Sequence, residues 1–340
     1  MLKATLHLLQ RFVLAAAYIL VVVALDWFAL HNIYPGDSRL PVRMISYLTP
    51  WLFMALIPGA IAAWLARRRW LFRVSLMLLA LFFIMYWPIW LPGQTQVYAG
   101  SNTGQLKVMT FNVNFANRNA QGIAKLIEIE QPDLIAFQEM TDDLFAELYP
   151  KIEISYPHYL VDNSWDLPMV LVSRYPLRAQ PKPARAIRAQ HAAGETSHGT
   201  VVIWNVHPNP VITTGWESQR ELLNLVAEDV ALEKRPVLVL GDFNTTNQTD
   251  NYRLIADQLV DVHWAVDRGF GFTWPDLSKA DTPDRSWPLR LLLKTGPVIG
   301  IDHIFASEHF IPQESYVVPH AYDSDHRPVV AELRMEVGDR

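Results

Sequence analysis

The last part of the chain contains an acidic cluster directly before an apolar run. Asp323, Asp325 and His326 occur within "DSDHRPVV", where two valines follow the only proline. Burying such charged groups without partners would be unfavourable, so the cluster needs either water or specific partners. It is therefore either a solvated acidic turn or the end of a strand that delivers a metal ligand and a base.

Similar polar residues end five other apolar runs of the sequence. Each run is rich in β-branched or other apolar side chains, as expected for a buried strand. The polar residues are Asn112 after "VMTF", Glu139 after "LIAFQ", His207 after "VVIWNV", Asp242 and Asn244 in "VLVLGDFN", and Asp302 with His303 in "GIDHIF". Because active sites of α/β proteins form at strand ends, we expect the six strands to bring these side chains into one polar patch.

The residue types in this patch limit its chemistry. Carboxylate and amide oxygens suit a hard ion such as Mg²⁺ or Mn²⁺. A histidine with an aspartate suits a base with an orienting partner, and amides with imidazole suit binding of phosphate oxygens. The chain has no cysteine, which excludes disulfides, thiolate nucleophiles and zinc–thiolate sites.

Composition separates the chain of 340 residues into two regions of different character. Residues 1–99 carry eight basic and two acidic side chains, a net charge of +6. The remaining residues carry 21 basic and 32 acidic side chains, a net charge of −11. We expect a transmembrane region at 1–95, a linker at 96–106 and a catalytic domain at 107–340.

Three apolar segments of the head, at 12–30, 44–65 and 74–91, are predicted to be transmembrane helices. Each is close to the roughly 20 residues that cross the hydrocarbon core. The four arginines of "ARRRWLFR" between the second and third segments place that loop and the N-terminus in the cytoplasm. Three spans then place the body on the extracytoplasmic side, although Arg39 and Arg43 in the first loop count against this orientation. Buried soluble helices are the alternative.

The body alternates strand-like runs with helix-like segments. The longest helical segment, "WESQRELLNLVAEDVALEK", places Leu222, Val226 and Val230 on one face with charges between them. Strands mixed with helices predict an α/β fold in which helices cover the sheets.

Six motifs of the body resemble, in order, those of the endonuclease/exonuclease/phosphatase superfamily of metal-dependent phosphodiesterases. They are "TFNV", "QEM", "NVH", "GDFN", "IDHIF" and "SDHRPV", and they span about 108–331. The resemblance implies a four-layer α/β sandwich, in which two packed mixed β-sheets are flanked by helices. The transmembrane head is not part of the resemblance.

The resemblance also implies roles for individual residues. The metal ligand would be Glu139, with Asn112 beside it and Asp325 in or near the coordination shell. Catalysis would rest on Asp242, Asn244, His207 and the His326–Asp302 pair, and which residue activates the water stays open. The substrate would contact Asn244, His207 and, from "FTWP", Trp274, for which plain packing is an equal alternative. We interpret His303 and Ser173-Arg174 as structural and Asp323 as a solvated turn acid.

Together these features predict a membrane-anchored, Mg²⁺-dependent hydrolase, with Mn²⁺ as a substitute, that cleaves a phosphodiester or phosphomonoester by in-line attack of water. Its partners would be the lipid bilayer and a lipid or small phosphoester, and no protein partner is expected. The acidic body disfavours nucleic acid, although "RAQPKPARAIR" could form a basic rim. The alternatives are an extracytoplasmic nuclease of the same family and a catalytically inactive, membrane-tethered binding module. We expect a multi-pass cell membrane protein with a cytoplasmic N-terminus.

Overall fold

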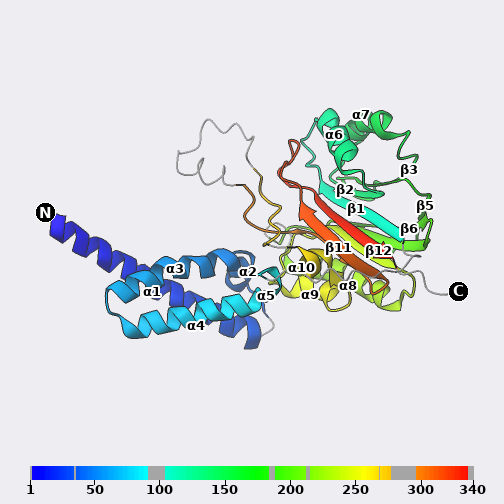
Figure 1. Cartoon of the computed structure of the whole chain (residues 1–340). Helices are drawn as coiled ribbons and strands as arrows, with labels where there is room; N and C mark the ends of the chain where they lie inside the picture. Colours follow the sequence, from blue (N-terminus) through cyan, green and yellow to red (C-terminus); the bar gives the residue numbers. More distant parts are fainter. Residues whose placement is uncertain are drawn as a thin grey trace. The chain divides into compact units, whose positions relative to one another are not determined.

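A computed structural model describes residues 2–33, 36–90, 104–183, 188–211, 215–267, 269–276 and 296–335. The chain forms two compact units (Figure 1). One comprises Met1–Trp90 with Gln248–Asp250, and the other comprises Leu91–Asn247 with Asn251–Arg340. Most of the predicted linker lies outside the described residues, and its last positions, 104–106, belong to the first strand of the body.

The head is entirely helical. Its helices are α1 (Leu2–Ile33), α2 (Leu40–Tyr47), α3 (Thr49–Leu65), α4 (Arg69–Met85) and α5 (Trp87–Trp90). α1 buries Ala17, Val21 and Ala24, which recur at helical spacing, and it packs on α3, where Gly59 lies against Ala17. The opposite face exposes large apolar side chains: Leu8, Leu9, Phe12, Ile19 and Val22. Such a face suits lipid better than water.

The three predicted spans are helical, but they differ in length and continuity. Among the described helices, only the stretch His7–Asn32 is by itself long and apolar enough to cross a membrane. The second segment is bent by 76° between α2 and α3. Pro50 has no N–H and its ring clashes with the preceding turn, so a single helix cannot continue through Ser46 to Thr49. Pro88 likewise ends α4 before residue 91, the predicted end of the third span. α4 itself has 17 residues.

The body contains two mixed six-stranded sheets. Sheet A has the order β11-β12-β1-β2-β4-β3, and sheet B has the order β5-β6-β7-β8-β10-β9. The strands of sheet A are β1 (Gly104–Asn112), β2 (Leu134–Gln138), β3 (His158–Asp162), β4 (Met169–Ser173), β11 (Phe310–Val317) and β12 (Val329–Met335). Those of sheet B are β5 (Leu177–Ala179), β6 (Ala189–Thr196), β7 (Gly199–Val206), β8 (Val237–Asp242), β9 (Val260–Asp261) and β10 (Asp302–Ala306). β1 pairs with β2 and β7 with β8 in parallel, and the other pairs are antiparallel.

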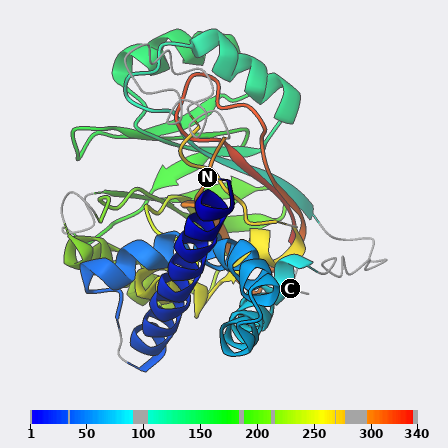
Figure 2. The ribbon, with the colours of Figure 1, turned by 90° about the vertical axis from the view of Figure 1, so that its left-hand side faces the viewer.

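Helices cover the outer face of each sheet, which confirms the predicted four-layer sandwich. α6 (Ala120–Glu130) and α7 (Asp142–Ile152) pack on sheet A, and α8 (Trp216–Leu232) and α9 (Asp250–Ala256) pack on sheet B. The short α10 (Val262–Val266) follows β9. Figures 1 and 2 show α6 and α7 on the far side of the sheets from α8. The predicted face of α8 is buried as expected, at Leu222, Val226 and Val230.

Besides the six runs that carry polar residues, the sequence has a seventh strand-like run, "PMVLVSRYPL", at 168–177. All seven contain strands, but β3, β6, β9 and β11 were not predicted. β6 has the sequence "AQHAAGET", which has few β-branched residues and no clean alternation, so it lacks a strand signal. The run predicted over 168–177 ends at Ser173 in β4. A new strand, β5, begins after Pro176.

The inner faces of the two sheets meet in one apolar core. On β1 the inward side chains are Leu106 and Val108, on β7 Val201 and Ile203, and on β8 Leu238 and Leu240. Because strand side chains alternate, the next inward positions are Thr110 and Asn112, Asn205 and His207, and Asp242. Each inward column therefore changes from apolar to polar at the same end of the sandwich.

Candidate active site

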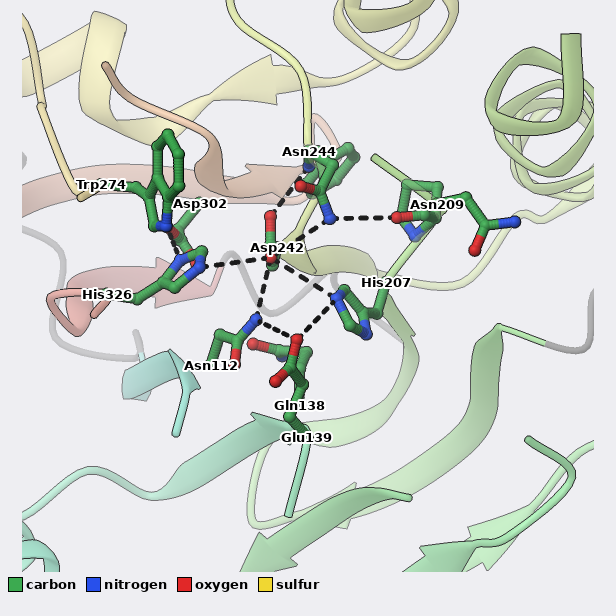
Figure 3. A network of polar contacts seen from close by, with 12 residues as sticks. Asn112, Gln138, Glu139, His207, Asn209, Asp242, Asn244, Trp274, Asp302 and His326 are labelled. Carbon is green, nitrogen blue, oxygen red and sulfur yellow. Dashed lines mark hydrogen bonds and ion pairs between the residues drawn. The ribbon is translucent and has the colours of Figure 1, made fainter. Parts of the chain in front are cut away.

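The polar ends of these columns form one buried cluster at the edge of both sheets (Figure 3). Sheet A contributes Asn112 and the residue after β2, Glu139, and sheet B contributes Asp242, Asp302 and the residue after β7, His207. The remaining members, Asn244, Trp274 and His326, lie on loops. The structure thus brings together the predicted strand-end residues apart from His303, which contacts Thr245 and Asp261 instead.

Asp242 lies at the centre of the cluster. Its Oδ2 accepts a hydrogen bond from Asn112 Nδ2 at 2.9 Å, and its Oδ1 accepts the backbone N–H of Asn244 at 2.8 Å. The Nε2 atoms of His207 and His326 lie 3.5 and 3.7 Å from Oδ2. Burial raises the pKa of Asp242 to about 7; the charge of His326 opposes this rise and that of Asp302 adds to it.

The position of this aspartate depends on the glycine before it. Gly241 has φ +150°, and a Cβ there would lie 2.0 Å from the carbonyl oxygen of Val206 on the neighbouring β7. No side chain fits, so β8 approaches β7 closely at the point where Asp242 and His207 emerge. The glycine of "GDFN" is therefore required by packing.

His326 is paired with Asp302 on the other side of Asp242. Its Nδ1 lies 2.9 Å from Asp302 Oδ2, and both side chains are buried. Burial lowers the pKa of His326, but the carboxylates of Asp302 and Asp242 outweigh burial and raise it to about 10. His326 is therefore an imidazolium, which carries an N–H on both ring nitrogens and donates from Nδ1 to Asp302.

Glu139 turns into the cluster through a left-handed backbone conformation, with φ 57°. Its Oε2 accepts the backbone N–H of Phe115 at 3.1 Å, and its Oε1 accepts Asn112 Nδ2 at 3.3 Å. His207 Nε2 lies 3.5 Å from the same Oε1. Residues other than glycine rarely adopt a left-handed backbone conformation, so the conformation of Glu139 is a specific feature that directs its carboxylate into the cluster.

His207 is a neutral imidazole in this surrounding. Burial, with the nearby charges of Arg188 and His326, lowers the pKa of His207 to about 3. The guanidinium of Arg188 lies over the ring of Trp165, 4.3 Å from its centroid, and its charge interacts with those of Glu139 and Asp242. Arg188 Nε is buried and makes no hydrogen bond within the described part of the chain.

The sequence identified Arg188 only as one member of a basic rim. Of that rim, Lys182 forms an ion pair with Asp162, Arg174 pairs with Asp133, and Arg185 lies outside the described residues. Arg188 alone among the described members interacts with the acids of the site. No local sequence signal distinguishes Arg188 from its neighbours, because its direction depends on the start of β6, which was not predicted.

Asp325 and Trp274 are tied to each other at the border of the cluster. Asp325 Oδ2 accepts the indole N–H of Trp274 at 3.0 Å, and Oδ1 accepts Asn114 Nδ2 at 2.6 Å. The Trp274 ring centroid lies 6.4 Å from that of His326. Both oxygens of Asp325 thus have protein partners, and the role of Asp325 as a metal ligand stays a prediction.

A cation could be held at either of two places in the cluster, at the trio of Asp242, Asp302 and His326 or at Glu139. Within the described residues, Asp242, Asp302 and His326 offer ligand atoms within 4.8 Å of one another. His326 is protonated, so neither of its ring nitrogens has a lone pair for a metal, which makes this trio a poor ligand set. Within the described residues Glu139 forms no ion pair with His326, and the buried Oδ1 of Asp302 has no hydrogen-bond partner there, which indicates that the site is electrostatically incomplete. The donor set is all oxygen apart from histidine, which fits Mg²⁺ or Mn²⁺.

The residues expected to be structural lie in the surroundings of the site. His303 contacts the carbonyl of Thr245 and the carboxylate of Asp261. Ser173 is buried and donates to the carbonyl of Asp133. Asp323 is exposed and accepts a hydrogen bond from Asn119. None of these three contacts involves a member of the central cluster.

Comparisons with known proteins agree with this architecture. The model of the Endonuclease/Exonuclease/phosphatase family matches residues 109–326. A comparison with curated protein sequences gives no significant match. An endonuclease/exonuclease/phosphatase from Bacteroides vulgatus is 19% identical with a TM-score of 0.53, covering 68% of this chain and 100% of that chain.

One eukaryotic and one bacterial structure have similar TM-scores to this chain. D. rerio TDP2 complexed with a single strand DNA product is 14% identical with a TM-score of 0.52, covering 68% of this chain and 99% of that chain. The beta toxin from Staphylococcus aureus is 16% identical with a TM-score of 0.51, covering 66% and 99%. At these identities the likeness shows a shared fold.

Proposed function

This chain belongs to the Endonuclease/Exonuclease/phosphatase family and is a metal-dependent phosphoester hydrolase; we propose that it is membrane-anchored, uses Mg²⁺ and cleaves a lipid or small phosphoester. The observation that carries the proposed chemistry is the buried arrangement of Asp242 between neutral His207 and cationic His326. A carboxylate flanked in this way can orient a water molecule while cationic and neutral donors contact the phosphate.

Each residue has a distinct part in the proposed in-line displacement. Asp242, whose pKa lies near 7, orients the attacking water and accepts its proton; the raised pKa of His326 argues against the His326–Asp302 pair as the base. His326, protonated and held by Asp302, donates a hydrogen bond to a phosphate oxygen. Asn244 fixes Asp242 through its backbone N–H and also lies within reach of the phosphate.

The phosphate is further bound by Arg188 and His207. Arg188 has an unpaired Nε beside the acids of the site, and an arginine fork matches two phosphate oxygens. Glu139 and Asn112, with Asp325 nearby, would hold Mg²⁺ or Mn²⁺, which neutralises charge on the transferred phosphoryl group when bound. Trp274 is fixed beside His326 by its bond to Asp325 and would pack on the substrate group next to the phosphate.

The proposed substrate is a lipid or small phosphoester rather than nucleic acid. The body carries a net charge of −11, and gripping many phosphates requires clustered Lys and Arg. The single strand DNA product bound by D. rerio TDP2 keeps a nuclease as the second candidate, since the folds are alike. An inactive binding module is the third, and the complete set of acids and histidines argues against it.

The proposed membrane anchor rests on the apolar head. His7–Asn32 would form one span, the bent pair α2–α3 a second, and α4, extended by α5, a third. The arginines at 67–69 and 73 favour a cytoplasmic loop between α3 and α4. Arg43, which counted against this orientation, is buried and donates to the carbonyl oxygens of Asp37 and Ser38, so it does not act as a free loop charge.

The test is a substrate panel on the full-length chain in detergent. Hydrolysis is measured in the presence of Mg²⁺, of Mn²⁺ or of EDTA. The substrates are sphingomyelin, phosphatidylinositol phosphates, bis(p-nitrophenyl) phosphate, single- and double-stranded DNA, and RNA. We expect hydrolysis of at least one lipid or small phosphoester, abolished by EDTA and reduced by about 10²–10⁴-fold in His326→Ala. The matched control is His320→Ala, which removes an exposed histidine and should leave the rate unchanged. Preferential cleavage of DNA or RNA would overturn the proposed substrate class.

A further inference from the structure

A layer of buried amides and one hydroxyl lies directly beneath the active-site cluster. It consists of Thr110, Gln138, Gln190 and Asn205, which are between 0 and 4% exposed. They come from β1, β2, β6 and β7, so the layer spans both sheets. Most of the inter-sheet core next to it is apolar, and these positions continue the same inward columns. Polar side chains are unfavourable here unless every donor and acceptor is matched.

The layer is matched by a closed set of hydrogen bonds. Gln138 Nε2 donates to Asn205 Oδ1 at 2.8 Å and to Thr110 Oγ1 at 3.0 Å. Asn205 Nδ2 donates back to the Phe137 carbonyl at 3.1 Å and to Gln190 Oε1 at 3.2 Å. Asn205 on β7 therefore bonds both to Gln138 and to the Phe137 carbonyl on β2, and these two hydrogen bonds form a bridge between sheet A and sheet B.

This bridge lies one or two residues before two members of the site. Gln138 immediately precedes Glu139, and Asn205 precedes His207 by two positions on the same strand face. Glu139 and His207 belong to different sheets, yet their Oε1 and Nε2 atoms are 3.5 Å apart. Apolar packing alone sets the spacing of two sheets only loosely, because it has no direction, whereas paired amides fix both distance and register.

We propose that Gln138 and Asn205 are positioning residues, which hold Glu139 and His207 in register across the two sheets so that metal and phosphate are bound in one geometry. This inference rests on the proposed function, because it assigns Glu139 to the metal and His207 to the phosphate. The amides would contact neither the metal nor the phosphate, and they would act by fixing the positions of the strand ends that carry Glu139 and His207.

The experiment replaces each amide with an apolar side chain of similar size, in Gln138→Leu and Asn205→Leu, and combines the two. Full-length protein is assayed for kcat and KM on the best substrate of the panel. Mn²⁺ affinity is measured without substrate by electron paramagnetic resonance, and the melting temperature is recorded. The matched control is Leu333→Ala, which removes buried apolar volume from the same core on β12.

We expect each single variant to lose about 10–100-fold in kcat and in Mn²⁺ affinity, the size of effect seen when the partners of metal ligands are removed. The double variant should lose little more than either single variant, because both break the same bridge. Leu333→Ala should melt at a lower temperature and keep the Mn²⁺ affinity and kcat of the wild type. If the amide variants do not fold, Thr110→Val, which removes only the hydroxyl bonded to Gln138, is the deciding variant and should lower both quantities.

The proposal would be overturned if Asn205→Leu and Gln138→Leu kept the kcat and the Mn²⁺ affinity of the wild type. Where those variants do not fold, the same result in Thr110→Val would overturn it. An inactive wild type would instead contradict the proposed function. In that case the Mn²⁺ measurement still decides whether the amide bridge positions Glu139.

Discussion

His326 Nδ1 and Asp302 Oδ2 lie 2.9 Å apart in the interior of the protein, although 24 positions separate the two residues in the chain. The pair joins the start of β10 to the loop before β12. It turns a histidine that burial alone would keep neutral into a cation with a pKa of about 10. Several consequences of this arrangement and of the surrounding site can be measured.

The first concerns Asp302→Asn and the alkaline side of the pH–rate profile. A raised pKa means that His326 stays protonated as pH rises, until pH passes about 10. The wild type should therefore show no loss of kcat/KM from His326 between about pH 7 and about pH 9. Without the Asp302 charge the pKa falls, so Asp302→Asn should lose activity within this range as pH rises. Identical profiles for the two proteins would contradict the ion pair.

The second concerns Glu139 and the metal. Glu139→Gln keeps the size of the side chain and removes its charge, so we expect Mg²⁺ affinity to fall by at least about 10-fold. The measurements are the Mg²⁺ concentration needed for half-maximal rate and direct calorimetric titration. Asp323→Asn is the matched control, because Asp323 is an exposed acid outside the central cluster. Equal losses in both variants would assign the effect to net charge.

The third concerns Arg188 and substrate affinity. A hydrogen bond to a charged group contributes about 1.5–3 kcal/mol, so Arg188→Ala should raise KM by about 10- to 100-fold. Arg188→Lys should recover only part of the affinity, because lysine lacks the planar fork. Arg235→Ala removes an arginine that pairs with Glu233 and should leave KM unchanged. A wild-type KM in Arg188→Ala would exclude phosphate contact by this residue.

The fourth concerns stability at a site away from the metal. Burial lowers the pKa of His263, but the hydrogen bond with Asp267 and the Asp261 charge outweigh burial and raise it above its ordinary value. A group with a raised folded pKa stabilises the protein below its unfolded pKa of about 6.5, and this contribution is lost as pH rises through the folded value. The free energy of unfolding lost in His263→Gln should therefore be about 1.5–3 kcal/mol near about pH 5.5, and it should become smaller as pH rises through the raised folded pKa.

Urea unfolding of the wild type and of His263→Gln at several pH values measures this difference. Asp267→Asn should show the same pH dependence, because it removes the other half of the pair. A difference between wild type and variant that grows with pH would have the wrong sign and would contradict the assignment.

The fifth concerns membrane orientation, which the absence of cysteine makes simple to test. Single cysteines at Ile154, an exposed position of the body, and at Arg68, in the basic loop of the head, can be labelled with a membrane-impermeant maleimide on intact cells. We expect labelling of Ile154→Cys only, and labelling of Arg68→Cys only after the membrane is opened. The reverse pattern would place the body in the cytoplasm.

The sequence predicted the α/β fold class and the clustering of polar residues at strand ends, because both depend on local patterns. Apolar runs gave the central strands, and the polar residue after each run marked its end. Where the local pattern was weak or interrupted, the prediction failed, as in the polar and alanine-rich β6 and at Pro50 and Pro88, where single residues broke helices that composition alone joined.

Asp323 and its neighbours show which features of the site the sequence determined and which depended on the tertiary structure. By itself the sequence determined that Asp325 and His326 precede a buried strand, and that acids, amides and histidines lie at one end of each of six strands. Only the folded chain decided which of them touch: Asn112 donates a hydrogen bond to Asp242 across 130 positions. Contacts between sheets depend on how strands pair and stack, and this long-range packing also directs Arg188 to the site and joins Gln138 to Asn205.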